Sequence, residues 1–319
     1  MTQRLRGRTA ATAVGALAVA AVLIVALAGH RDEFAQALRG APLWVLLVAT
    51  LLQGVALLSR CEAWHTCVTA AGGRISRRRL FHAGGLGNLG SLLNAQVGAA
   101  ARIAVLKRSG RDEVPKIPVL IAAEVPILAI EAALAVLSSY TLVGPLGLPW
   151  WAPLAGFAVA VGMVLGLRRL AGRGHGIWIG LAVLRSLEGR TRVLAFVLVA
   201  VFAQIARNWL VLRALGVDAS VFDATAVLIA MVVLSQLPIG PSVGAAAVVV
   251  ILGTGGLALT AAAGVLLTAT GTAGGLCFAL WAGLDVLARP GERARRRARP
   301  VVVAGSRPVP SARPVPARV

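Results

Sequence analysis

The stretch SQLPIGPSVGAAA, residues 235–247, interrupts a long apolar segment of this chain. The run ATAVLIAMVVL precedes it and the run VVVILG follows it. Proline removes a backbone donor and blocks a helix, whereas glycine permits a tight turn. The prolines Pro238 and Pro241 and the glycines Gly240 and Gly244 therefore predict two short helices separated by a break. What such a break can do depends on the solvent that surrounds the chain.

The composition of the chain is that of a membrane protein. Of its 319 residues, 58% are hydrophobic and only 14% are charged, against about 25% charged residues in ordinary soluble domains. Several apolar runs approach or exceed the roughly 20 residues that span a bilayer, and Thr9–Gly29 and Trp151–Leu167 contain no charge. We therefore expect an all-α polytopic membrane protein whose first apolar run is a retained helix rather than a signal peptide.

Basic residues concentrate in cytoplasmic loops, and they orient six predicted full transmembrane helices with both termini in the cytoplasm. The predicted spans are about Thr9–Gly29, Pro42–Ser59, Ile117–Val143, Trp151–Leu167, Val193–Arg213 and Ala258–Leu284. In this topology the outer loops contain only three basic residues, Arg31, Arg39 and Arg213. The net charge of +20 is thereby explained by orientation in the membrane, and nucleic acid is not an expected partner.

Three parts of the chain follow from this topology. They are a basic cytoplasmic N-terminus at 1–9, a transmembrane helical domain at 10–287 and an Arg/Pro-rich cytoplasmic tail at 288–319. The tail combines many charges with prolines and lacks apolar periodicity, so we expect it to be disordered. It either holds anionic lipid electrostatically or is a solvated end.

Two segments each have to begin and end on one side of the membrane. Leu80–Leu106 has basic loops on both sides, and the neighbouring spans place both ends of Ala224–Gly253 outside. Because their halves are short for full crossings, we predict two interrupted, re-entrant helix pairs. Broken backbone at membrane depth must be buried in protein or line a water-filled cavity, and in transporters it often builds the substrate site. A tight turn at the membrane surface is an equally weighted alternative for the second break.

Other motifs point to packing rather than to chemistry. GLGNLG at Gly85–Gly90 fits G-x-G-x-x-G, but no strand precedes it, so it predicts close helix packing instead of a dinucleotide site. Gly271 and Gly275 predict a similar packing face. His175–Arg192 is too short between its charges to span, and it is predicted to be an interfacial amphipathic helix.

The chain contains no recognisable catalytic constellation and is not expected to be an enzyme. Its cysteines, Cys61, Cys67 and Cys277, have no paired spacing. Cys61, Glu62 and His65 lie within one helical turn, but no second cluster supports a metal site. We therefore expect neither a metal nor a cofactor.

Ionisable residues inside the predicted spans are the strongest candidates for function. Glu124 and Glu131 are seven residues apart and therefore share one helix face. Arg207 and its neighbour Asn208 lie in another span. Glu131 and Arg207 both lie about 21 Å from the start of their spans, which predicts an ion pair that a substrate phosphate would open. A purely structural ion pair that locks the helices is the alternative.

Two segments resemble motifs of the lysylphosphatidylglycerol synthase transmembrane-region family. They are NLGSLLNAQVGAAARIAVLKRSG (Asn88–Gly110), which matches at Asn88, Gly98, Arg102 and Arg108, and Arg213–Leu252, which matches at Arg213, Gly216, Pro238, Pro241 and Gly244. The acids that the family's motifs place beside Gly98 and after Gly244 are absent: Ala99, Ala100 and Ala245–Ala247 stand there. The resemblance covers about residues 10–287.

The resemblance implies a flippase-like translocase of the bacterial cytoplasmic membrane, acting on a lipid such as an anionic phospholipid or on a polyprenyl-linked substrate. The synthase reaction is not implied, because no aminoacyl-transferase domain is recognised. The candidate path residues are Asn88, Gly98, Arg102, Glu124, Glu131, Arg207, Asn208, Pro238, Gly240, Pro241 and Gly244. The missing acids favour an alternative, a non-transporting membrane partner of an envelope lipid or glycan synthesis enzyme. Expected protein partners are such an enzyme or a second copy of the chain.

The predicted topology can be tested by single-cysteine labelling. Cysteines at Arg78 and Ser109 should react only from the cytoplasm, and cysteines at Asp218 and Thr254 only from outside, because each interrupted segment begins and ends on one face. A membrane-impermeant maleimide, applied before and after permeabilisation, measures this. Labelling from opposite sides within either pair would contradict the topology.

Overall fold

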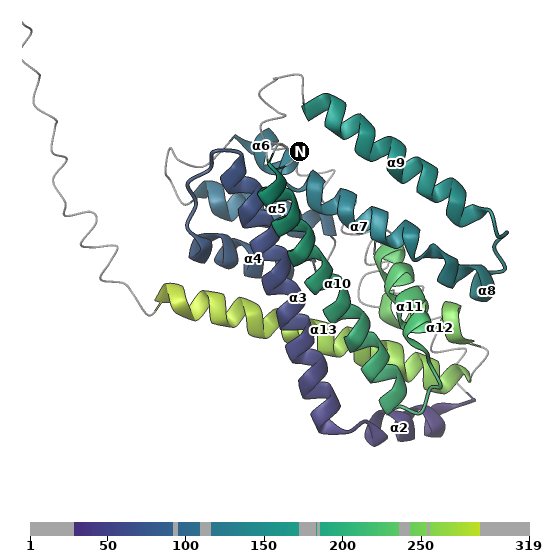
Figure 1. The fold of residues 1–319 in the computed structure, drawn as a ribbon. Coiled ribbons are helices and arrows are strands. Elements are labelled where there is room, and N and C mark those ends of the chain that lie inside the picture. The colour runs from purple at the N-terminus through teal and green to yellow at the C-terminus, as the bar shows by residue number, and fades with distance from the viewer. Residues whose placement is uncertain are drawn as a thin grey trace, which may run out of the picture. The chain divides into compact units, whose positions relative to one another are not determined.

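The structure, a computed structural model, describes residues 29–91, 95–108, 116–171, 183, 186–235, 243–253 and 256–287. These residues form helices and no strand (Figure 1), which confirms the predicted all-α class for this part of the chain. The first predicted span, the tail at 288–319 and the break residues Pro238, Gly240 and Pro241 lie outside the described residues.

The described helices follow one another with short connections. They are α2 (Arg31–Gly40), α3 (Leu43–Ala70), α4 (Arg77–Ser91), α5 (Ala95–Arg108), α6 (Ile117–Ala122), α7 (Val125–Leu137), the 3-10 helix η1 (Ser139–Leu142), α8 (Val143–Leu146), α9 (Ala152–Ala171), α10 (Leu187–Ala214), α11 (Val221–Leu234), α12 (Val243–Leu252) and α13 (Leu257–Leu287).

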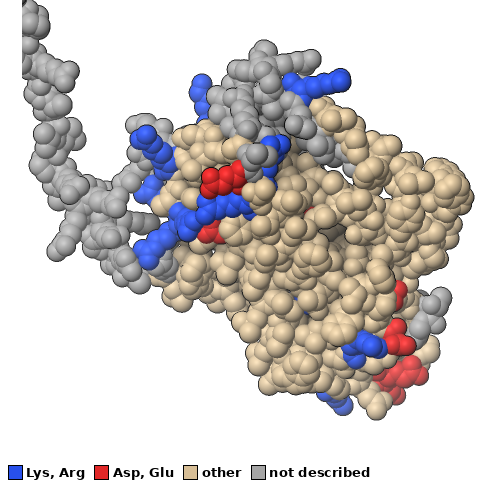
Figure 2. All heavy atoms as spheres, in the orientation of Figure 1, with Lys and Arg blue, Asp and Glu red and all other residues tan. Residues whose placement is uncertain are grey.

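Four helical segments are long and apolar enough to cross a membrane: Leu43–Ala70, Ile117–Leu137, Glu188–Ala214 and Leu257–Leu284. They correspond to four of the six predicted spans, and large apolar side chains such as Leu43, Trp44 and Leu51 remain exposed on them. Figure 2 shows a broad uncharged face with charged side chains gathered towards its ends. These are the features of a membrane protein, whereas the number of crossings and the side of each terminus stay predictions.

Two predicted span boundaries are wrong. The second span does not end at Ser59, because α3 continues for 28 residues to Ala70. Arg60 therefore lies inside a helix rather than in a cytoplasmic loop. The span expected from Val193 begins earlier, at Leu187, so residues 187–192 form the first turns of α10 and not part of a separate interfacial helix.

Local capping signals explain the length of α10. At its start the Gly189 N–H donates to Ser186 Oγ (3.1 Å), which satisfies one of the free donors of the first turn. At its end Gly216 adopts φ +82°, and the Val217 N–H donates to the Leu212 carbonyl (3.1 Å). This left-handed glycine closes the helix as a C-cap. A serine before the helix and a glycine after it thus determine its ends.

The predicted span Ile117–Val143 is interrupted near its middle. Pro126 has no N–H with which to bond the Ala122 carbonyl, and its ring crowds that carbonyl. The chain responds with a tighter turn, in which the Glu124 N–H donates to the Ile121 carbonyl (3.0 Å), and α7 begins at Val125. Glu124 therefore lies at a break between α6 and α7, a feature that the sequence analysis missed although both prolines are visible in IPVLIAAEVP.

Both interrupted segments are confirmed as pairs of short helices that pack against each other. In the α4–α5 pair, a Cβ added to Gly87 would lie 3.0 Å from the Gly98 carbonyl oxygen, and one on Gly90 would lie 3.1 Å from the Gly98 Cα. Glycines thus bring the two backbones into contact, as the G-x-G-x-x-G run predicts. Their position within the membrane stays a prediction.

A second close approach joins α12 to α13. A Cβ added to Gly264 would collide with the backbone of Ala245 and would lie 2.6 Å from the Gly244 carbonyl oxygen. Gly244 itself has no room for a side chain, because Thr268 and the Gly264 carbonyl oxygen occupy that space. Gly244, a predicted path residue, is therefore a packing residue in this structure.

Replacing Gly264 with alanine should destabilise the protein. The added methyl group has no space against Ala245, so we expect a loss of about 1–3 kcal/mol in the free energy of unfolding, as for other overpacked cores. Gly162→Ala in α9 is the matched control, because nothing lies within 4 Å of the added Cβ. Unfolding of both variants in detergent measures the difference. Equal stability of the two variants would contradict this packing.

Candidate functional site

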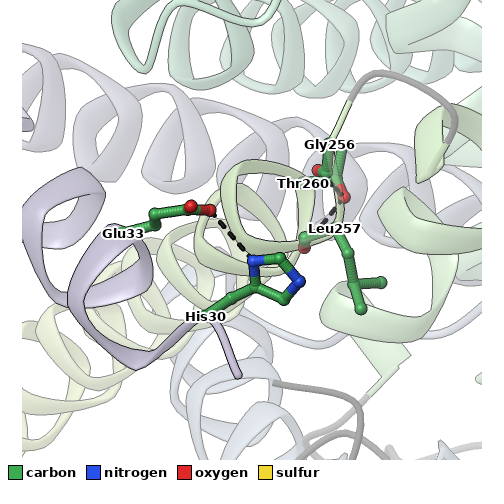
Figure 3. Close-up of polar contacts among 5 residues, drawn as sticks. All are labelled: His30, Glu33, Gly256, Leu257 and Thr260. Atoms are coloured by element: carbon green, nitrogen blue, oxygen red, sulfur yellow. Dashed lines mark hydrogen bonds and ion pairs between the residues drawn. The ribbon is translucent and has the colours of Figure 1, made fainter. Parts of the chain in front are cut away.

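Several polar groups of the helices are satisfied locally. Thr260, which is buried, donates to the carbonyl oxygens of Gly256 (2.8 Å) and Leu257 (3.2 Å), as Figure 3 shows. In the same view His30 Nδ1 lies 3.2 Å from Glu33 Oε2 at the exposed start of α2. Other threonines that donate to a carbonyl one turn earlier are Thr50, Thr66, Thr268 and Thr270. The candidates for function are therefore the charged and amide side chains.

Four charged side chains gather between α3, α5 and the α6–α7 segment, and we call them the ion-pair cluster: Arg60, Arg102, Glu124 and Glu131. Arg60 Nη1 lies 3.0 Å from Glu131 Oε1, and Arg102 Nη1 lies 2.9 Å from Glu124 Oε1. Three of these four residues are predicted path residues. The cluster has two positive and two negative charges, so its carboxylates and guanidinium groups balance.

The ion-pair cluster lines an open pocket of about 210 Å³. Arg60, Arg102 and Glu124 provide its polar wall, and Ile127 and Leu128 of α7 provide its apolar wall. The space is small for a whole lipid headgroup, but it is large enough for water or a small polar group. The break between α6 and α7 places Glu124 at this wall.

The polar groups of the cluster are only partly satisfied. The ion pair between Arg102 and Glu124 is close, but Glu124 Oε1 is not aligned as a hydrogen-bond acceptor. Within the described part of the chain, Arg102 Nε and the indole Nε1 of Trp64 are also buried without a partner. The Arg102 guanidinium carbon lies 4.8 Å from the Trp64 ring centroid, a cation–π distance. Such groups can accept a polar guest with little loss of existing hydrogen bonds.

A second polar group lies between α3, α10 and α13, and we call it the Arg207 cluster: Gln53, Arg207 and Asn208. Arg207 Nη1 donates to Gln53 Oε1, and Arg207 Nη2 donates to Asn208 Oδ1 (3.3 Å). The side chains are well enclosed: Arg207 is 4% exposed and Asn208 is fully buried. Gln53 precedes Arg60 by two turns of α3, so the two clusters lie about 10 Å apart along one helix face.

The predicted ion pair between Glu131 and Arg207 is wrong. Glu131 binds Arg60, and Arg207 binds two amide oxygens instead. The error follows from the span boundary: with Arg60 assigned to a loop, Glu131 had no other basic partner at its depth. A helix that continues to Ala70 brings Arg60 to the carboxylate.

The other predicted path residues have structural positions. Gly98 is a contact between α4 and α5, and Asn88 lies against Gly275 of α13, where any side chain on that glycine would collide with the Asn88 amide. The residues that the sequence analysis missed are Arg60, Gln53 and Trp64. Gln53 carried a usable signal, because it is the one polar amide in the apolar run LWVLLVATLLQGVALL.

The cysteine, glutamate and histidine of α3 do not form a metal site. Glu62 Oε1 lies 3.5 Å from Arg77 Nε at the start of α4, so its carboxylate is engaged elsewhere. Cys61 is buried, and its sulfur occupies the space that a side chain on Gly84 would need. Among the described residues, no three His, Cys, Asp or Glu side chains are placed to hold a metal ion.

Comparison of the chain with protein-family models, with the curated proteins and with the solved structures gives no match. The resemblance to the lysylphosphatidylglycerol synthase transmembrane-region family therefore stays a hypothesis drawn from short motifs.

A double-mutant cycle on Arg102 and Glu124 should reveal strong coupling. Each single glutamine variant leaves a largely buried charge without its partner, so we expect it to lose roughly 2–4 kcal/mol of unfolding free energy. The double variant should lose clearly less than the sum of the two. The exposed pair Arg213 and Asp218 (2.5 Å) is the control, with an expected coupling of about 1 kcal/mol or less. Additive losses at Arg102 and Glu124 would show that the pair contributes nothing.

Proposed function

We propose that the chain is a flippase-like translocase of a lipid or lipid-linked substrate in the bacterial cytoplasmic membrane. The observation that carries the proposal is the ion-pair cluster, which lines a pocket between helices apolar enough to cross a membrane. A charge placed at the centre of a membrane-spanning helix costs about 2.5–3.5 kcal/mol on insertion scales. Four such charges at one pocket are expensive unless they have a function.

The arrangement suits exchange of partners by a charged headgroup. A lipid phosphate that enters the pocket can pair with Arg102 or Arg60 while Glu124 or Glu131 is released, and a cationic group on the same headgroup can pair with the released carboxylate. The number of ion pairs is then conserved at each step, so no charge is left without a partner. The second cluster, two turns further along α3, provides the next polar position on a path through the apolar helices.

The break between α6 and α7 supports the same proposal. Glu124 lies at a turn where the ordinary helical hydrogen bond to Ala122 is missing because of Pro126. A helix interrupted at a charged residue is a recurrent feature of membrane transporters, in which the interruption lines the substrate path. The resemblance to the synthase transmembrane-region family adds the substrate class, an anionic phospholipid or a polyprenyl-linked sugar.

A second candidate function is that of a non-transporting membrane partner of an envelope-synthesis enzyme. One observation favours it: two positions at which the family motifs carry acids are filled by small residues that pack helices together. Ala245, which is 3% exposed, lies against Gly264, and Ala99 follows Gly98 at the α4–α5 contact. A carboxylate at position 245 would be buried in an apolar contact. The missing acids are thus compatible with a helix bundle that no longer translocates.

Leaflet exchange of fluorescent lipids in proteoliposomes separates the two candidates. We expect wild-type protein to accelerate the exchange of at least one anionic lipid, measured by quenching of the outer leaflet with dithionite. The Arg102→Gln/Glu124→Gln double variant conserves net charge, so it should insert but exchange lipid at least about tenfold more slowly, a loss of about 1.4 kcal/mol of transition-state stabilisation. Its matched control is Arg213→Gln/Asp218→Asn, an exposed pair that should leave exchange unchanged.

Exchange no faster than in protein-free vesicles, for anionic, zwitterionic and polyprenyl-linked probes alike, would favour the scaffold function. Exchange that the Arg102 and Glu124 double variant preserves would remove the ion-pair cluster from the mechanism.

A further inference from the structure

The two polar clusters differ in charge balance. Each arginine of the ion-pair cluster has a carboxylate within 3.0 Å. Arg207, by contrast, contacts only the amide oxygens of Gln53 and Asn208, and no carboxylate pairs with it within the described part of the chain. Arg207 is also the most enclosed of these arginines, with 4% of its surface exposed. The Arg207 cluster therefore has one net positive charge in an apolar surrounding.

The unsatisfied atoms of this cluster are all donors. Arg207 Nε and Asn208 Nδ2 are buried, and neither has a hydrogen-bond partner among the described residues. The two amide oxygens that could accept a bond already bind the guanidinium. Leaving buried donors unpaired costs about 1–3 kcal/mol for each neutral group and more for a charged one. What the cluster lacks is therefore an acceptor with at least two oxygens and a negative charge.

The neighbouring helix is shaped around these side chains. On α13, a Cβ added to Gly271 would lie 3.2 Å from Arg207 Nη1, and one added to Gly274 would lie 2.8 Å from the Gln53 side chain. Glycines at these positions leave the space that the guanidinium and the amide fill. α13 crosses α3 and α10 where the cluster lies (Figure 1). Three helices thus build one enclosed site with excess donors.

We propose that Gln53, Arg207 and Asn208 form a binding site for a phosphate-class oxyanion. A guanidinium binds phosphate through two parallel N–H donors, and the amide of Asn208 adds a third. The anion is either the phosphate of a lipid headgroup or free inorganic phosphate, since the recognised chemistry is the same. Arg207 lies about 10 Å from the C-terminal end of α10, a depth that a headgroup drawn in from that side can reach. The site requires only that an anion binds, so it does not depend on lipid transport.

Two binding measurements on purified full-length protein distinguish the sources. Inorganic phosphate is titrated by calorimetry into protein in a neutral detergent, with chloride at equal ionic strength as the reference. Native mass spectrometry then compares retention of phosphatidylglycerol with that of phosphatidylcholine. We expect one saturable site in at least one of the two measurements, and the measurement that detects it identifies free phosphate or lipid as the source.

The variants test whether Arg207 and Asn208 form this site. Arg207→Gln removes the charge and should abolish the saturable site. Asn208→Asp places a carboxylate beside the guanidinium and acts as an internal counter-ion, so it should weaken binding at least tenfold while raising the unfolding temperature without ligand. Arg213→Gln is the control, because that arginine is exposed and pairs with Asp218; its binding should equal that of wild type.

Asn208→Asp keeps the proposal testable if Arg207→Gln does not fold. Binding to Asn208→Asp that equals wild-type binding, or the absence of a saturable site for both ligands in the wild type, would overturn the proposal. Lipid exchange measured on the same preparations keeps the two proposals apart. An oxyanion site without exchange removes only the translocase, and exchange without an oxyanion site removes only this inference.

Discussion

Every charge on the apolar helices must find its partner inside the protein, because hydrocarbon provides none. Much of the described structure follows from this requirement. Arg60 in the middle of α3 needs Glu131 of α7, and Arg102 of α5 needs Glu124 at the start of α7. These two ion pairs join three segments that are far apart in the sequence. Hydrophobic contact alone would not select this arrangement, since apolar side chains can pack equally well against lipid.

Close approach of backbones is the second condition for these contacts. Arginine and asparagine side chains reach their partners only where the opposing helix has no side chain of its own. Gly275 makes room for Asn88, Gly274 for Gln53 and Gly271 for Arg207. The glycines of α13 therefore connect packing to polar chemistry, and their function differs from that of Gly264, which only lets α12 lie against α13. In a membrane, such small residues also supply the van der Waals contact that holds helices together.

The two clusters divide the polar interior into a balanced and an unbalanced part. In the ion-pair cluster each charge has an opposite partner, so a guest must exchange with an existing contact. In the Arg207 cluster a positive charge and two unpaired donors await an acceptor. Two turns of α3 separate them, and apolar side chains of two distinct cores lie on either side. An anionic headgroup is the kind of guest that both can bind, which is why the charge balance, rather than the fold class, carries the functional argument.

Composition and periodicity by themselves determined that the chain is helical and suited to a membrane, because apolar runs of spanning length have few other stable states. Prolines and glycines indicated both short helix pairs, and an isolated charge in an apolar run marked Arg102, Glu124, Glu131 and Arg207 as candidates. The partner of each charge was decided only by tertiary structure. Whether α3 ends at Ser59 or continues to Ala70 cannot be read from a run in which arginine is tolerated wherever a distant glutamate compensates it. Helix depth estimated from sequence therefore paired Glu131 with the wrong arginine, and the folded contacts between α3 and α7 assigned it to Arg60.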